Sequence, residues 1–179
     1  ATRQFKPLPL GVTIDLTVRS SLRHSQTVNV IGRLHGVGGH ATQAIVIGGH
    51  YDHFGIRDAV KGDSIYNGAL DNASGTAAVI ALAEAFSRSG VRPGRSLLFT
   101  AFGAEESGLL GSEAMAAHPP LPLRDLAAVL NLDEMNLFGR TRDISALGEN
   151  QSSLGPTFTR AAATEASAGD GARPVVAAR

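Results

Sequence analysis

The stretch AIVIGGHYD, residues 44–52, joins a run of apolar and glycine residues to a histidine and an aspartate. Such a run, bounded by polar residues, is typical of a strand buried on both faces of a sheet. Two runs of the same kind follow, SLLFTAF at 96–102 and AAVLNL at 127–132. Residues 73–89 repeat apolar side chains at helical spacing, and Asn72 can cap the start of this helix. Strands alternating with helices predict a three-layer α/β/α sandwich with a mixed, mainly parallel central sheet.

Weaker patterns predict the remaining elements of what we expect to be a single domain over residues 1–179. Residues 12–20 and 27–34 alternate in polarity and are rich in β-branched side chains, so they predict a hairpin at one edge of the sheet. Residues 51–71 contain few aliphatic side chains and predict a long loop of the kind that is usually functional. The rest of the chain predicts helices at 109–118 and 153–167 and short strands at 143–147 and 174–178.

The composition limits the classes of function. The 179 residues contain 16 basic and 16 acidic side chains, so no excess charge favours a nucleic acid or a membrane surface as partner. No stretch is long and apolar enough to predict a membrane span. The absence of cysteine excludes disulfides, thiolate zinc sites and a cysteine nucleophile. Residues 50–149 hold 13 of the 16 acidic residues, which indicates a localised acidic site.

Side chains of the kinds that bind metals follow each of the three apolar strands and precede the long helix. In chain order they are His50, Asp71, Glu105, Glu106 and Asp133. The carboxyl ends of parallel strands lie along one edge of a sheet, so we expect these groups to converge there. Facing carboxylates repel one another, a divalent cation removes that penalty, and histidine with carboxylates suits zinc. One aspartate can bridge two ions about 3.5–4 Å apart, and one of two adjacent glutamates can act as general base while the other binds metal.

Four of these five residues also have a simpler interpretation. Alone, His50 could be a histidine satisfied in the core, and Asp71 could be a helix cap. Glu105 and Glu106 could form an exposed first helical turn. Asp133 ends a very apolar strand, where a buried carboxylate needs a partner. Because the groups are expected to meet, we favour the metal site for all of them.

Four ordered motifs carry a resemblance to a known family. They are HYDHFG (50–55), YNGALDNASGTAAV (66–79), FTAFGAEESGLLGSEAM (99–115) and NLDEMN (131–136). Together they resemble the M28 metallopeptidases, which include bacterial aminopeptidases with two co-catalytic zinc ions. The resemblance runs from about residue 29 to residue 148. It implies a zinc-dependent exopeptidase, and more narrowly an aminopeptidase, that acts on peptides.

The resemblance implies two zinc ions and their ligands. One ion would be bound by His50 and Asp133. The other would be bound by Glu106, and Asp71 would bridge both. The family pattern then requires a histidine late in the chain, but none follows His118. We therefore expect a chain that is incomplete at its C-terminus and trimmed at its N-terminus, where many relatives carry a protease-associated domain.

The resemblance also implies the catalytic residues. Glu105 would be the general base on a zinc-activated water, and Asp52 would orient the imidazole of His50. His53 is left unassigned, because it could line the site or lie in a surface loop. The resemblance implies export to the periplasm or the cell exterior. Two alternatives stay open: a carboxypeptidase or glutaminyl-cyclase-like enzyme on the same scaffold, and a non-catalytic fragment with an incomplete metal site.

Overall fold

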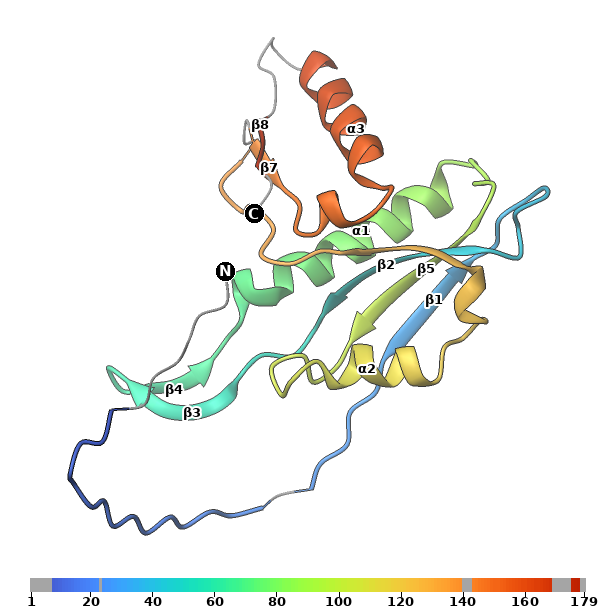
Figure 1. Ribbon diagram of the computed structural model, residues 1–179. Coiled ribbons are helices and arrows are strands. Elements are labelled where there is room, and N and C mark those ends of the chain that lie inside the picture. Colours follow the sequence, from blue (N-terminus) through green and yellow to red (C-terminus); the bar gives the residue numbers. More distant parts are fainter. Residues whose placement is uncertain (1–7, 23, 140–142, 169–174, 178–179) are drawn as a thin grey trace.

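The protein is built around a four-stranded sheet, seen in a computed structural model that describes residues 8–22, 24–139, 143–168 and 175–177 (Figure 1). The strand order is β1-β5-β2-β6, where β1 is Val30–Leu34, β2 is Ala44–His50, β5 is Ser96–Phe102 and β6 is Leu126–Asn131. Strand β2 pairs in parallel with both β5 and β6, whereas β1 runs antiparallel to β5. The predicted mixed, mainly parallel sheet is confirmed. The predicted burial of the third apolar strand is wrong: β6 is mostly exposed, and so is Asp133 after it, because β6 lies at the edge of the described sheet.

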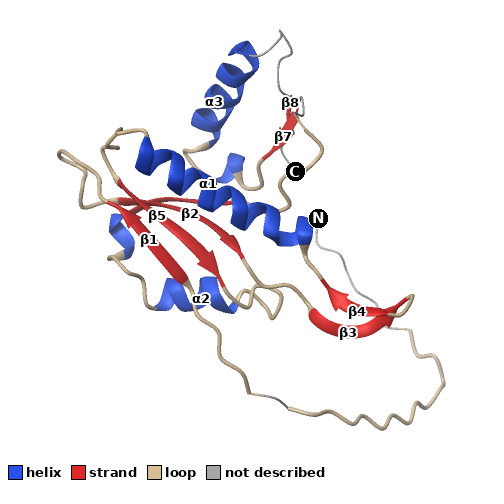
Figure 2. Ribbon diagram, turned by 180° about the vertical axis from the view of Figure 1, so that it is seen from behind, coloured by secondary structure: helices blue, strands red, loops and turns tan. Residues whose placement is uncertain are grey.

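Helices cover both faces of the sheet. They are α1 (Gly75–Arg88) and α2 (Leu110–Ala117). Neighbouring residues of a strand point to opposite faces, and β2 shows the result. Val46 shares one core cluster with Met115 of α2, and Ile47 shares the other with Val79 of α1. Figure 2 shows the two helices on either side of the sheet, so the central strands are apolar on both faces rather than alternating.

The predicted hairpin at the edge of the sheet is wrong in one of its strands. Within the described residues, 12–20 form no strand and are exposed, and Figure 1 shows them as an extended trace away from the sheet. The other predicted strand is present as β1, but its partner is β5. Alternating polarity fits a strand with two different faces, yet a strand forms only where its backbone finds a hydrogen-bonded neighbour. The pattern of 12–20 does not identify such a neighbour.

The predicted loop at 51–71 contains a small hairpin that the sequence pattern missed. Its strands are β3 (Gly55–Val60) and β4 (Asp63–Tyr66), which pair antiparallel. The chain reverses at Gly62, where φ is +89° and a glycine is therefore favoured. Every residue of β3 is exposed, so this strand has no buried face to mark it by alternation. An irregular turn at Ala69–Ser74, in which Asp71 and Asn72 have non-helical backbone angles, then leads into α1.

The C-terminal elements form a separate pair of strands. Strands β7 (Asp143–Ser145) and β8 (Val175–Ala177) are parallel, and α3 (Gly155–Ala168) lies between them in the chain. The strands and helix predicted here are present with slightly different bounds. Two short 3-10 helices complete the structure, Leu123–Asp125 and Glu149–Gln151. Among the described residues, no helix has both the length and the apolar character that a membrane crossing requires.

Candidate metal centre

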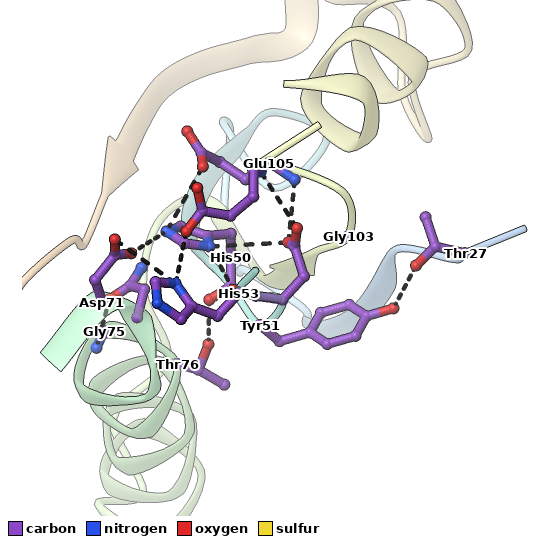
Figure 3. A network of polar contacts seen from close by, with 12 residues as sticks. Thr27, His50, Tyr51, His53, Asp71, Gly75, Thr76, Gly103 and Glu105 are labelled. Carbon is purple, nitrogen blue, oxygen red and sulfur yellow. Dashed lines mark hydrogen bonds and ion pairs between the residues drawn. The ribbon is translucent and has the colours of Figure 1, made fainter. Parts of the chain in front are cut away.

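The predicted ligands meet at the carboxyl edge of the sheet (Figure 3). His50 is the last residue of β2, and only 2% of it is exposed. Its Nε2 atom lies 3.1 Å from Asp71 Oδ1 and 3.5 Å from Asp133 Oδ1. Glu105 Oε2 is 4.0 Å from the same nitrogen. Residues from β2, the turn before α1 and the segments after β5 and β6 are therefore brought together by the fold.

Asp52 supports the centre through both its backbone and its side chain. The Nδ1–H of His50 donates to the Asp52 carbonyl oxygen at 3.0 Å, which leaves Nε2 facing the carboxylates. The Asp52 carboxylate is 3.8 Å from Nδ1 and accepts the backbone N–H groups of Glu105 (3.0 Å) and Glu106 (3.2 Å). Asp52 thus orients the imidazole through its carbonyl and fixes the Glu105–Glu106 turn through its carboxylate.

His53 joins the centre, although the sequence did not assign it. Its Nδ1 lies 2.6 Å from Glu106 Oε1 and 3.8 Å from Asp71 Oδ2. Its side chain is 19% exposed, so it lines the site instead of extending into water from a loop. The available signal was its spacing, since His53 lies three residues after His50, the last residue of β2.

Asn72 forms hydrogen bonds to two separate segments of the centre. It is 1% exposed, its Nδ2 donates to the Leu132 carbonyl at 2.9 Å, and its Oδ1 accepts the Gly75 N–H at 2.9 Å. Through this second bond Asn72 satisfies the first N–H of α1, although the residue at the N-cap position of the helix is Ser74. A Cβ at position 75 would overlap the Leu132 carbonyl oxygen, so only glycine allows this close approach. The start of α1 is thereby held against the segment that carries Asp133.

The concentrated negative charge shifts two pKa values. Burial lowers the pKa of His50, but its hydrogen bond to Asp52 and the nearby carboxylates, Asp133 foremost, raise it to a net value above the ordinary 6.5. Burial raises the pKa of Glu105 above 4.5, and the carboxylate of Glu106 adds to the increase while His50 opposes it. A bound cation would relieve the repulsion among these carboxylates.

Two groups of described side chains could each hold a metal ion. They are His50 with Asp71 and Asp133, and His53 with Asp71 and Glu106. In each group an imidazole nitrogen and two carboxylate oxygens lie within 4.8 Å of one another. Two ligands of a tetrahedral zinc ion lie roughly 3.4 Å apart, given metal–ligand distances of about 2.1 Å. The His50 distances of 3.1 and 3.5 Å match this spacing, and the donor types suit zinc.

Imidazole and carboxylate groups lie together at the carboxyl edge of a sheet covered by helices, so the structure defines an α/β protein with a candidate metal site at that edge. Comparison with known proteins then identifies the family. The family model described as "Peptidase family M28" matches residues 29–173, and the chain belongs to this family. The resemblance drawn from the four motifs is confirmed.

Several known proteins are similar to this chain. BSAP, a zinc aminopeptidase from Bacillus subtilis, is 26% identical with a TM-score of 0.56, over 82% of this chain and 33% of that one. An aminopeptidase from Aneurinibacillus sp. strain AM-1 is 28% identical with a TM-score of 0.56, over 84% and 34% of the two chains. Leupeptin-inactivating enzyme 1 of Streptomyces exfoliatus is 42% identical over 74 residues, which are 40% of this chain and 17% of that enzyme. The chain thus spans about a third of these solved structures and about a fifth of the curated relatives.

Proposed function

We propose that the chain carries the catalytic centre of a zinc-dependent aminopeptidase, which removes N-terminal residues from peptides. The position of Glu105 supports this most strongly. Glu105 belongs to neither group of metal ligands, yet its Oε2 lies 4.0 Å from His50 Nε2. A carboxylate held beside a metal site but outside its ligands is placed to act as a general base.

The residues of the centre have different roles, either metal binding or proton transfer. His50 and Asp133 would hold one zinc ion and Glu106 a second, and Asp71 would contribute to both. Zinc bound in such a site polarises the scissile carbonyl and lowers the pKa of water. Glu105 accepts a proton from the attacking water on its carboxylate and then delivers it to the nitrogen of the leaving amine. Burial raises the pKa of Glu105 above its ordinary value, which makes this carboxylate a stronger proton acceptor.

A shallow, open hollow lies on the exposed hairpin that follows His53. Phe54, Arg57, Asp58 and Tyr66 line it, and its volume is about 390 Å³. The ring of Phe54 lies 4.6 Å from the ring of His53, so the hollow adjoins the metal centre. The carboxylates favour a positively charged α-amino group nearby, and both solved relatives are named aminopeptidases. These observations support attack at the N-terminal residue.

Release of N-terminal residues from unblocked peptides by the zinc-loaded protein tests the proposal. Glu105→Gln should lower kcat by about 10²–10⁴, the usual contribution of a general base, while zinc binding persists. Glu113→Gln is the matched control, because Glu113 is an exposed residue of α2. Cleavage of N-acetylated peptides alone, or full activity in Glu105→Gln, would refute the proposal.

A further inference from the structure

We infer that Asn29 is a positioning residue for Glu105, the general base of the proposed mechanism. Asn29 lies directly before β1, and its side chain fixes the segment between β5 and α2 that carries Glu105. The inference rests on the proposed function and adds to it a residue that acts only through the base.

Asn29 forms hydrogen bonds at both ends of the segment that carries Glu105. This segment, residues 103–109, joins β5 to α2. The Oδ1 atom of Asn29 accepts the Gly103 N–H at 3.1 Å, and its Nδ2 donates to the Gly111 carbonyl at 2.7 Å. One side chain therefore sets the separation between the end of β5 and the start of α2.

The backbone beside Glu105 has a conformation that needs support from other segments. Ala104 has φ +55°, in the left-handed region that is unfavourable for a residue with a Cβ. Such a conformation persists only where the surrounding contacts impose it, and it is often found at functional sites. On one side of Ala104, Asn29 accepts the N–H of Gly103. On the other side, Asp52 accepts the N–H of Glu105 at 3.0 Å. The direction in which the Glu105 side chain leaves the backbone is thus imposed by two residues from outside the segment.

Close packing leaves the Asn29 amide little freedom to move. A Cβ at position 111 would lie 2.3 Å from the Gly103 carbonyl oxygen and 2.6 Å from Asn29 Oδ1, so the start of α2 lies directly against both groups. Gly103 and Gly111 are buried, and Asn29 is half-buried. An apolar side chain at position 29 would leave the buried Gly103 N–H without this acceptor, which favours movement of the segment toward water.

Asn29 is itself held by a contact with the end of β2. Tyr51 follows β2, and its hydroxyl donates to the Val28 carbonyl at 2.8 Å and lies 2.9 Å from Thr27 Oγ1. Figure 3 shows the Tyr51 side chain extending from beside the metal centre toward Thr27. Tyr51 also precedes Asp52 in the chain. The two supports of the general base, Asn29 and Asp52, are therefore linked through Tyr51.

A purely structural link between β1 and α2 is the alternative role of Asn29. In that case its loss would lower stability, and any effect on kcat would be the same whether or not Glu105 is present. If Asn29 acts through Glu105, its loss should have little effect once Glu105 has been replaced, because the effects of residues that act as a unit are not additive. A double-mutant cycle in kcat therefore distinguishes the two roles.

The cycle is measured with the zinc-loaded 179-residue chain and an unblocked peptide. Asn29→Leu should lower kcat about 10–100-fold and leave KM nearly unchanged, because a misplacement of about 1 Å at a reacting group costs about 100-fold. In the Glu105→Gln background, Asn29→Leu should lower kcat by no more than about 3-fold. Asn29→Asp keeps an acceptor for the Gly103 N–H and should lose less of kcat than Asn29→Leu. Asn29→Ala, which adds no bulk, repeats the cycle if Asn29→Leu does not fold.

Ser96→Ala is the matched control, because it removes buried hydrogen bonds at the other end of β5. Ser96 is the first residue of β5 and is fully buried. Its Oγ donates to the Ala41 carbonyl at 2.9 Å and accepts the Gly36 N–H at 3.2 Å. Ser96→Ala and Asn29→Leu should both lower the melting temperature, by about 2–8 °C. The kcat of Ser96→Ala should stay within about 3-fold of the unmodified protein, because Ser96 and Glu105 share no partner.

Amide hydrogen exchange provides a readout that needs no activity. The Glu105 N–H donates to Asp52, and the Leu110 N–H donates to the Ala104 carbonyl at 3.1 Å. After allowance for the change in global stability, both N–H groups should exchange at least about 10-fold faster in Asn29→Leu than in the unmodified protein. Ser96→Ala should leave both exchange rates unchanged after the same allowance.

Two results would overturn the inference: an equal loss of kcat on Asn29→Leu with and without Glu105, or unchanged exchange of the Glu105 and Leu110 N–H groups. Failure of the proposed function is a separate outcome. If the unmodified protein cleaves no unblocked peptide, that function is refuted, and hydrogen exchange alone decides whether Asn29 fixes the segment. Peptide cleavage that depends on Glu105 but not on Asn29 would refute only the role of Asn29.

Discussion

Replacing Asn72 by alanine should destabilise the protein and weaken its metal centre together. Asn72 is buried, donates to the Leu132 carbonyl and accepts the Gly75 N–H, both at 2.9 Å. These bonds join the start of α1, next to Asp71, to the segment that carries Asp133. One side chain therefore sets the separation of two proposed ligands, although it touches neither metal position.

The magnitude follows from the two hydrogen bonds of Asn72. Each contributes about 0.5–1.5 kcal/mol, and a buried group left without its partner costs about 1–3 kcal/mol. Asn72→Ala removes both bonds and leaves the Leu132 carbonyl without this donor, so the free energy of unfolding should fall by about 3 kcal/mol. For a chain of this size the melting temperature should fall by about 6–12 °C. Zinc affinity should fall about 10–100-fold, as when other supporting partners of a metal site are lost.

Two measurements separate these effects. Thermal unfolding of the zinc-free protein gives the change in stability, and calorimetric titration with zinc gives the change in affinity. Asn67→Ala is the matched control, because Asn67 is exposed and its Nδ2 donates to the Ile65 carbonyl at 3.3 Å. The control should stay within about 0.5 kcal/mol of the unmodified protein. A melting temperature of Asn72→Ala within about 2 °C of the unmodified protein, together with unchanged zinc affinity, would refute this role of Asn72.

Three further predictions concern protonation, support of the base and backbone packing. Zinc affinity should fall as the pH is lowered, beginning above pH 6.5, because zinc binds neutral imidazole and the pKa of His50 is raised; a flat affinity in titrations across this range would contradict it. In the zinc-free protein, protonated His50 stabilises the folded state because its pKa is raised. This contribution to the free energy of unfolding is fully present below pH 6.5 and is lost as the pH rises through the raised pKa. An asparagine at position 52 cannot accept both N–H groups. The free energy of unfolding of Asp52→Asn, measured in urea, should therefore fall by about 1.5 kcal/mol. This is the low end for a charge-assisted hydrogen bond, because the Asp52 side chain is 21% exposed. Asp52→Asn should also lower kcat more than it changes KM, because Glu105 is displaced. Unchanged kinetics would show that the Glu105–Glu106 turn keeps its conformation without the Asp52 carboxylate. Gly75→Ala should destabilise by at least about 1–3 kcal/mol through overlap with a neighbouring carbonyl oxygen, whereas Gly94→Ala meets no atom within 4 Å and should leave thermal unfolding nearly unchanged.

Much of the centre could be predicted because its ligands follow strands with an unmistakable pattern. Strands buried on both faces, such as β2 and β5, are apolar along their whole length, and the structure bears out their positions. Parallel strands bring their carboxyl ends to one edge, so residues far apart in the chain could be expected to meet. His50, Asp71, Glu106 and Asp133 do meet there. Their binding of zinc stays a prediction.

Local pattern was insufficient where a partner in space determines the outcome. Residues 12–20 alternate like a strand but remain unpaired among the described residues, and the exposed strands β3 and β4 pair without a strong apolar signal. Strand formation depends on a hydrogen-bonding neighbour, and the residues of the segment itself do not specify that neighbour.

The order of residues is enough to infer the layered sheet and the acids and histidine at its edge, because apolar periodicity and parallel pairing are regular. The inward orientation of His53 could be learned only from packing, since it depends on Gly68, Phe54 and Tyr66. The contacts of the Asp52 carboxylate could also be learned only from the tertiary structure, because it accepts two N–H groups that lie 53 and 54 residues further along the chain. Contacts of this range arise when separate elements are brought together, and no local pattern specifies them.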